Sequence, residues 1–151
     1  MKDNGLLIDN GLFFAEVKRM LAKGCSVTIR AKGRSMYPFI RDGRDLIVLL
    51  GNTEVNEGDI VLAELPDKSY VLHRIYQMQG DEILLMGDGN LHSMERCRKD
   101  AVLGKAIRII RGSRQVDCAS ACERRKAVVW RRLLPVRRYL LFALRLVKSQ
   151  K

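Results

Sequence analysis

The stretch SYVLHRIYQMQGDEILLMGDGN, residues 69–90, determines how the rest of the chain is interpreted. Residues 69–79 and 82–87 are rich in apolar, β-branched and aromatic side chains, and the Gly-Asp pair between them is a strong turn signal. The stretch therefore predicts a β-hairpin, with His73 inside its first strand and Asp88 just beyond its second.

Other parts of the sequence show the same character on either side of this hairpin. The further predicted strands are residues 26–33, 44–50, 57–65 and 102–112. A helix is expected over residues 12–24, where apolar side chains recur at helical spacing and a glycine ends the run. Six short strands with turns at close intervals predict a mainly β domain, barrel-like or a sandwich, with an N-terminal helix.

The basic charge of the chain is concentrated at its C-terminal end. Residues 1–123 contain 18 basic and all 17 acidic residues, a net charge of +1, whereas residues 124–151 contain ten Lys and Arg and no Asp or Glu. From about residue 121 the pattern is helical, with Pro135 as a kink or break. We therefore divide the chain into an N-terminal helical segment (1–25), a β-rich core (26–116) and a basic amphipathic helical tail (117–151).

The tail has two interpretations that the sequence leaves open. Its arginines and leucines form two rows: Arg124, Arg131, Arg138 and Arg145 on one side, and Leu133, Leu140, Leu144 and Val147 on the other. Such a helix, residues 124–151, suits the surface of an anionic membrane. It equally suits packing on the core with its arginines in water. Nucleic acid is disfavoured as a partner, because the core adds no basic surface and no aromatic RNA-binding motif.

The sequence shows neither a secretory signal nor a membrane span. The start contains acidic residues and glycines where a continuous apolar run would be needed, and no window reaches the ~20 apolar residues of a span. We expect a cytoplasmic protein, peripheral at the inner membrane face where the tail binds lipid. The cysteines are Cys25, Cys97, Cys118 and Cys122. Their spacing matches no common zinc or redox pattern, so we expect free thiols, no metal and no cofactor.

A serine, a histidine and an aspartate stand in order at predicted turns and strands. Ser35 lies in GRSMYP, residues 33–38, and its hydroxyl is a poor nucleophile until a base takes its proton. His73 lies on an apolar strand face, where an imidazole is unexpected, and Asp88 lies between two glycines. Taken singly, these residues fit a polar turn residue, a core histidine and a turn aspartate. Together, their order favours a nucleophile, a general base and an acid that orients the base.

Five sequence boxes resemble those of the S24/S26 serine peptidases, the group of signal peptidases and LexA-like self-cleaving repressors. The boxes are GRSMYPFIRDGRDLIVL, EGDIVLAEL, YVLHRI, LLMGDGN and VLGKAIRII, and the match covers roughly residues 26–112. The resemblance implies an all-β core and a peptide or protein substrate bound as an added strand. It is closest to the Ser-His type of signal peptidase, and it implies Ser35 as nucleophile, His73 as general base and Asp88 as orienting acid.

The surroundings of Ser35 depart from the family pattern at one position. Gly33 stands where signal peptidases usually carry a serine that can donate to the oxyanion. The resemblance then leaves the oxyanion to backbone amides, with that of Ser35 first, and we assign Gly33, Arg34 and Met36 to substrate and oxyanion binding. Loss of one oxyanion donor can cost ~100-fold in rate or more.

A second departure concerns the acid. The His-type relatives carry another aspartate six residues beyond the one in the Gly-Asp box, and that position is Met94 here. Glu95 and Asp100 are nearby alternatives, although neither fits the motif. Two other family features are not expected in this sequence: the N-terminal membrane anchor typical of signal peptidases and the DNA-binding domain typical of repressors.

The function expected from these features is that of a serine endopeptidase that cleaves a leader or signal segment bound in extended form. The alternative is a catalytically weak or inactive peptide-binding module on the same β-fold, which Gly33 and Met94 favour. The sequence predicts no oligomeric state.

Overall fold

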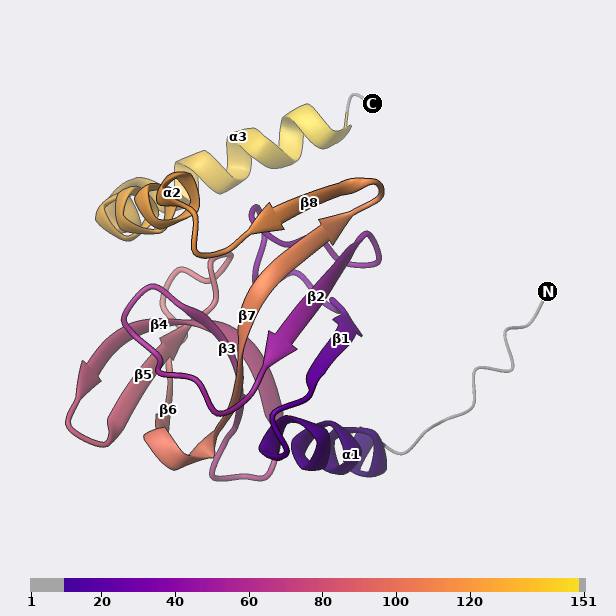
Figure 1. Ribbon diagram of the computed structural model, residues 1–151. Helices are drawn as coiled ribbons and strands as arrows, with labels where there is room; N and C mark the ends of the chain where they lie inside the picture. Colours follow the sequence, from indigo (N-terminus) through magenta and orange to yellow (C-terminus); the bar gives the residue numbers. More distant parts are fainter. Residues whose placement is uncertain (1–9, 150–151) are drawn as a thin grey trace.

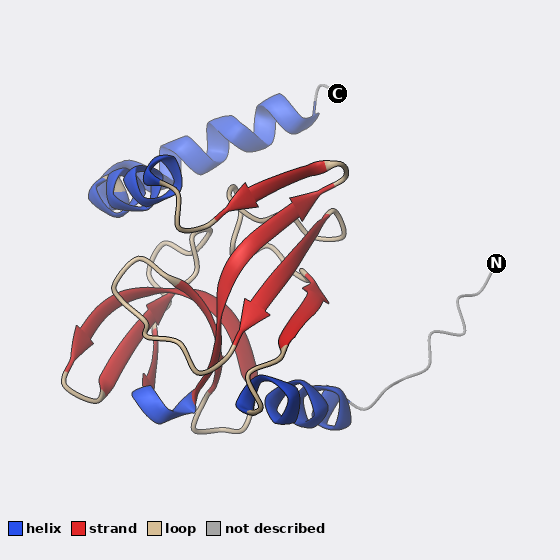
Figure 2. Ribbon diagram, in the orientation of Figure 1, coloured by secondary structure: helices blue, strands red, loops and turns tan. Residues whose placement is uncertain are grey.

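The computed structural model describes residues 10–149, which form a curled antiparallel sheet with helices at its two ends (Figures 1 and 2). Residues 1–9 of the predicted N-terminal segment and 150–151 of the predicted tail lie outside the described residues. The helices are α1 (Asn10–Ala22), α2 (Ala121–Arg132) and α3 (Arg137–Ser149), with 3₁₀ turns η1 (Lys99–Ala101) and η2 (Leu134–Val136). Figure 1 shows α1 at one end of the sheet and the pair α2 and α3 at the other.

Eight strands form the sheet in the described part of the chain. They are β1 (Ser26–Arg30), β2 (Asp45–Leu50), β3 (Ile60–Glu64), β4 (Tyr70–Gln79), β5 (Glu82–Met86), β6 (Glu95–Arg98), β7 (Val102–Arg111) and β8 (Arg114–Asp117). Their order is β1-β2-β7-β3-β4-β5-β6, with β8 paired to β7, and every pair is antiparallel. The prediction of a mainly β core with helices before and after it is confirmed.

The prediction of six strands was wrong, because β6 and β8 were missed. Their sequences, ERCR and RQVD, each contain a single apolar residue, Cys97 and Val116. Both strands pair on one side only, β6 with β5 and β8 with β7. Strands at a sheet edge commonly carry charged side chains, so the alternation that marks a buried strand is weak there.

The two faces of the β4–β5 hairpin pack in different surroundings. Ile75 joins Ile83 and Leu85 in one buried cluster, whereas Leu72 packs against a second cluster that includes Leu62. Because side chains alternate along a strand, His73 points to the same face as Ile75, and Arg74 points to the opposite face.

The tail bends near Pro135, as predicted. Helix α2 ends at Arg132, the 3₁₀ turn η2 contains the proline, and α3 begins at Arg137. Ser120 caps the start of α2 by accepting a hydrogen bond from Glu123 N at 3.3 Å. In the described part of the chain, no helix has both the length and the apolar character needed to cross a membrane.

Candidate active site

Ser35 lies in the turn between β1 and β2, and this turn packs directly on the loop that follows β5. Gly89 N donates a hydrogen bond to Ser35 O at 2.8 Å. A Cβ atom on Gly87 would lie 2.4 Å from Ser35 O, and one on Gly89 would lie 2.6 Å from Arg34 O. The glycines on either side of Asp88 are therefore required because the Ser35 turn leaves no room for a side chain.

Asp45 anchors the base of this turn from the first position of β2. Its fully buried carboxylate accepts from Arg41 N at 2.9 Å and pairs with Arg44 at 2.6 Å and Arg111 at 3.4 Å. Burial alone would raise the pKa of Asp45, but the hydrogen bonds from Arg44 and the Arg41 amide, together with the nearby arginine charges, hold it below its usual value. Arg111 also donates to Phe39 O, which ties the turn to β7.

His73 is buried on β4 and has a carboxylate partner. Its Nδ1 lies 2.8 Å from Oε2 of Glu95, the first residue of β6, and the His73 residue is 5% exposed. A carboxylate at Nδ1 fixes the ring orientation and presents Nε2 as the nitrogen that can take a proton from a serine. In chemical terms, the pair is an imidazole whose orientation is set by a carboxylate.

The strand register places the backbone oxygen of Ser35 on the same side of the hairpin as His73. Arg74 on β4 is the partner of Met86 on β5, so extending the antiparallel register by one residue sets His73 opposite Gly87. Ser35 O packs where the Cβ of Gly87 would lie. In the described part of the chain no hydrogen bond joins Ser35 Oγ to His73, and catalytic hydrogen bonds often form only when substrate is bound.

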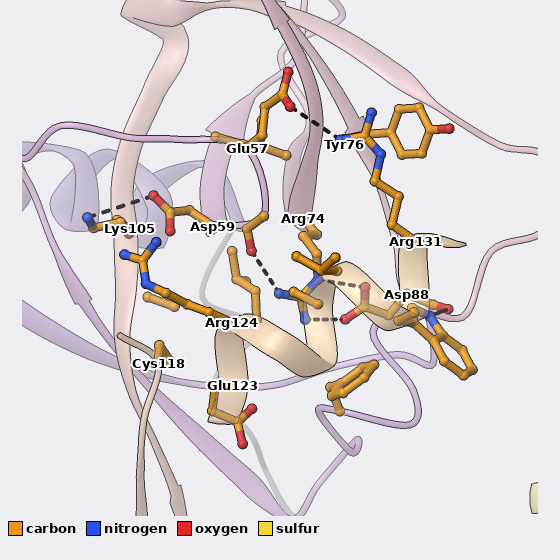
Figure 3. Close-up of a pocket in the computed structure, with 18 of the residues that line it drawn as sticks. Glu57, Asp59, Arg74, Tyr76, Asp88, Lys105, Cys118, Glu123, Arg124 and Arg131 are labelled. Carbon is orange, nitrogen blue, oxygen red and sulfur yellow. Dashed lines mark hydrogen bonds and ion pairs between the residues drawn. The ribbon is translucent and has the colours of Figure 1, made fainter. Parts of the chain in front are cut away.

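Asp88, the predicted orienting acid, lies elsewhere. Its buried carboxylate forms two parallel hydrogen bonds with Arg74, at 2.8 and 2.7 Å (Figure 3). Arg74 also donates to Gly58 O at 2.8 Å. Burial would lower the pKa of Arg74, but the charge and hydrogen bonds of Asp88 raise it. The structure thus brings Glu95, and not Asp88, to His73, and Asp88 holds the opposite face of β4.

The remaining predicted residues divide between the surface and the core. Gly33, with φ +84°, and Arg34 are exposed beside Ser35. The Met36 side chain is buried in the cluster under the turn, so only the backbone of Met36 can contact a substrate. Met94 and Asp100, at and beyond the position of the missing aspartate, are both exposed.

A cavity of about 360 Å³ lies on the Arg74 face of the sheet, beneath α2 (Figure 3). Six of its charged side chains form three ion pairs: Glu57 with Arg131 at 3.3 Å, Asp59 with Lys105 at 3.8 Å, and Arg74 with Asp88. Burial raises the pKa of the Cys118 thiol to about 11. Because this thiol stays protonated near neutral pH, it is not an activated nucleophile. Phe39 of the Ser35 turn lines the cavity, whereas Ser35 and His73 do not.

The C-terminal helices pack on the elements that carry the candidate site. Trp130 Nε1 donates to Asp88 O at 2.9 Å, and its ring meets Phe39 edge to face at 5.6 Å. Arg137 donates to Asn90 O at 3.1 Å. Helix α2 and the start of α3 therefore stabilise both the Ser35 turn and the loop after β5.

Glu95, the carboxylate that contacts His73, was named from the sequence only as an alternative that does not fit the motif. It follows by one residue the position where His-type relatives carry their second aspartate. A search for any carboxylate within one residue of that position would have favoured it, since a strand beginning there passes beside β5 and close to β4.

Comparison with known proteins identifies the family. A search of the curated proteins found no match. The family model described as Peptidase S24-like matches residues 9–107, which is 99 of the 151 residues. The match includes Ser35, His73 and Glu95, and members of this family are generally serine peptidases. The chain therefore belongs to the S24-like peptidase family.

Proposed function

We propose that the protein is a serine endopeptidase that cleaves a peptide segment bound in extended form. Ser35 is the nucleophile, His73 the general base and Glu95 the carboxylate that positions the base. The observation that carries the proposal is the pairing of buried His73 with partly exposed Glu95, with 2.8 Å between Nδ1 and Oε2, on the face of the hairpin where Ser35 O packs. Asp88 has no place among the reacting groups, because Arg74 holds both of its oxygens.

The chemistry follows from these positions. His73 Nε2 takes the proton of Ser35 Oγ as the oxygen attacks the scissile carbonyl, and Glu95 stabilises the imidazolium through Nδ1–H. The imidazolium then gives the proton to the leaving amine, and water hydrolyses the acyl-enzyme with the same base. Within the described residues, the amides of Ser35 and Met36 donate to no other backbone group. Both are therefore free to donate to the oxyanion, in place of the side chain that Gly33 lacks.

The substrate is proposed to add to the sheet beside β1. This strand pairs with β2 along one edge, and no other strand of the described residues pairs with it. The chain reaches Ser35 five residues after β1 ends at Arg30. An extended peptide on this edge would present its backbone to the Ser35 turn. Leader or signal segments, which lack tertiary structure around the cleavage site, are the substrate class that suits such binding.

The test is covalent labelling by a serine-reactive fluorophosphonate probe at neutral pH, measured as the mass of the intact protein. The folded wild type is expected to gain one probe, and Ser35→Ala and His73→Ala to gain none. Ser93→Ala and His92→Ala are the matched controls, since both residues are exposed, and both variants should label as wild type does.

The labelling has two outcomes against the proposal. If the folded wild type stays unlabelled while a known relative reacts, the catalytically weak peptide-binding module becomes the better description. If Ser35→Ala still labels, the nucleophile is another residue.

A further inference from the structure

The outer face of α3 is apolar and uncovered in the described part of the chain. Tyr139, Phe142 and Leu146 recur at helical spacing and are 70%, 65% and 53% exposed. We call these three residues the outer stripe. The helix rests on the rest of the protein through its two buried residues, Arg137 and Leu141. Single exposed apolar residues are common on proteins, but a continuous stripe of large ones marks an interaction surface.

Basic residues border the outer stripe. Arg138 precedes Phe142 by four positions and Arg145 precedes Leu146 by one, and both are exposed. No acidic residue follows Glu123 anywhere in the sequence, so the helix presents apolar and positive groups without a negative charge among them. A partner for this face must therefore accept large apolar side chains and supply negative charge at the same time.

We propose that the outer stripe of α3 docks on an anionic lipid surface. Interfacial helices insert their apolar side chains at the headgroup boundary while neighbouring arginines contact the lipid phosphates. A second copy of the chain fits poorly, because it would place Arg138 and Arg145 against identical charges. Nucleic acid would satisfy the arginines but would leave Phe142 and Leu146 against phosphates and sugars.

The contacts of α3 with the rest of the protein determine which residues lie near the membrane when α3 is docked. Tyr37, two residues after Ser35, donates from its hydroxyl to Leu144 O on α3 at 3.4 Å. Arg137 holds Asn90 at the other end of the helix. A docked α3 therefore keeps the Ser35 turn near the lipid surface. On the proposed peptidase function, the substrates are peptide segments lying on or emerging from that surface.

The test is co-sedimentation of the full chain with vesicles of phosphatidylcholine alone or mixed equally with phosphatidylglycerol. Wild type is expected to bind the mixed vesicles, to bind less as salt is raised, and to bind phosphatidylcholine weakly. Phe142→Ser combined with Leu146→Ser should lower binding more than about 10-fold. Arg138→Gln and Arg145→Gln should each lower it about 5-fold.

Matched changes elsewhere separate docking from general effects. Leu12→Ser on α1 and Arg96→Gln on β6 alter residues that are as exposed as those of the outer stripe, and both should leave binding unchanged. The Ser35→Ala variant should bind fully, so that loss of catalysis and loss of docking are distinguishable.

Three results would overturn the docking proposal. One is equal binding to the two kinds of vesicle, and another is full binding by the Phe142→Ser, Leu146→Ser variant. The third is self-association of wild type in ultracentrifugation that the same double variant abolishes, since this would assign the stripe to a second copy of the chain.

Discussion

His73 and Arg74 are neighbours on β4 and point to opposite faces of the strand. The two faces differ in how the side chain is bound by its carboxylate partner. Each side chain is held by one carboxylate at a similar distance, His73 by Glu95 at 2.8 Å and Arg74 by Asp88 at 2.7 Å. On the Arg74 side, both oxygens of the carboxylate are engaged and the guanidinium also binds Gly58 O. On the His73 side, Nδ1 bonds to Glu95, and within residues 10–149 the other ring nitrogen has no hydrogen-bond partner.

The difference shows how a carboxylate's partner decides its role. An arginine stays charged at all ordinary pH values and forms two parallel hydrogen bonds with a carboxylate, so Arg74–Asp88 is a permanent link between β4 and the loop after β5. An imidazole has two separate ring nitrogens, and Glu95 contacts only Nδ1, so the His73–Glu95 pair is a single hydrogen bond. The Arg74 side is thus expected to govern stability, and the His73 side reactivity.

The largest expected effect concerns the Arg74 side of β4, which is expected to govern stability. Asp88→Asn removes the charge that balances Arg74 and should lower the free energy of unfolding by about 3–5 kcal/mol, because a largely buried cation without its counter-charge is costly. Urea unfolding measures it. The control Glu57→Gln breaks an exposed ion pair with Arg131 at the same cavity and should cost at most about 1 kcal/mol. A folded, stable Asp88→Asn that fails to label with the probe would instead make Asp88 part of the catalytic machinery.

The second prediction concerns the His73 side of β4, which is expected to govern reactivity. Glu95→Gln should slow labelling of Ser35 by ~100-fold or more, because the amide cannot stabilise a charged imidazolium. The urea midpoint should change little, since Glu95 is partly exposed. Glu82→Gln on β5, an exposed carboxylate that pairs with Arg96, should label at the wild-type rate. Unchanged labelling of Glu95→Gln would remove Glu95 from the proposed site.

The third prediction concerns the contact between Gly87, in the loop after β5, and the Ser35 turn. Gly87→Ala places a methyl group against Ser35 O and should cost about 1–3 kcal/mol of stability, since the backbone must shift. Labelling should slow as well, because the shift moves Ser35 away from His73. Gly80→Ala, in the turn between β4 and β5, meets no atom within 4 Å and strains only its own backbone. If both variants slow labelling equally, the close approach at Gly87 does not position the nucleophile.

The smallest effect is expected from the C-terminal helix. Trp130→Phe keeps the ring against Phe39 but loses the hydrogen bond to Asp88 O, which should cost about 1 kcal/mol. Val129→Ala, an exposed neighbour on α2, should cost almost nothing. Comparison of the two urea midpoints measures how much the Trp130–Asp88 hydrogen bond adds to the free energy of unfolding.

The parts of the molecule that were predictable from the sequence are those governed by local pattern. The β4–β5 hairpin follows from its alternating runs and Gly-Asp turn, and the break between α2 and α3 follows from Pro135. Strand β6 could not be found this way, because ERCR has a single apolar residue. Since Glu95 opens that strand, missing β6 also meant missing the partner of His73.

The sequence by itself determined the mainly β core, the order of Ser35 and His73 at turn and strand, and the concentration of positive charge after residue 123. Only the tertiary structure decided that Glu95 pairs with His73 and that Asp88 pairs with Arg74. Alternation along β4 sends His73 and Arg74 to opposite faces, and the pairing of β5 with β6 then brings Glu95 to one face while the loop after β5 brings Asp88 to the other. Such pairings depend on the register between strands that are distant in the sequence. A motif within one segment carries no information about that register.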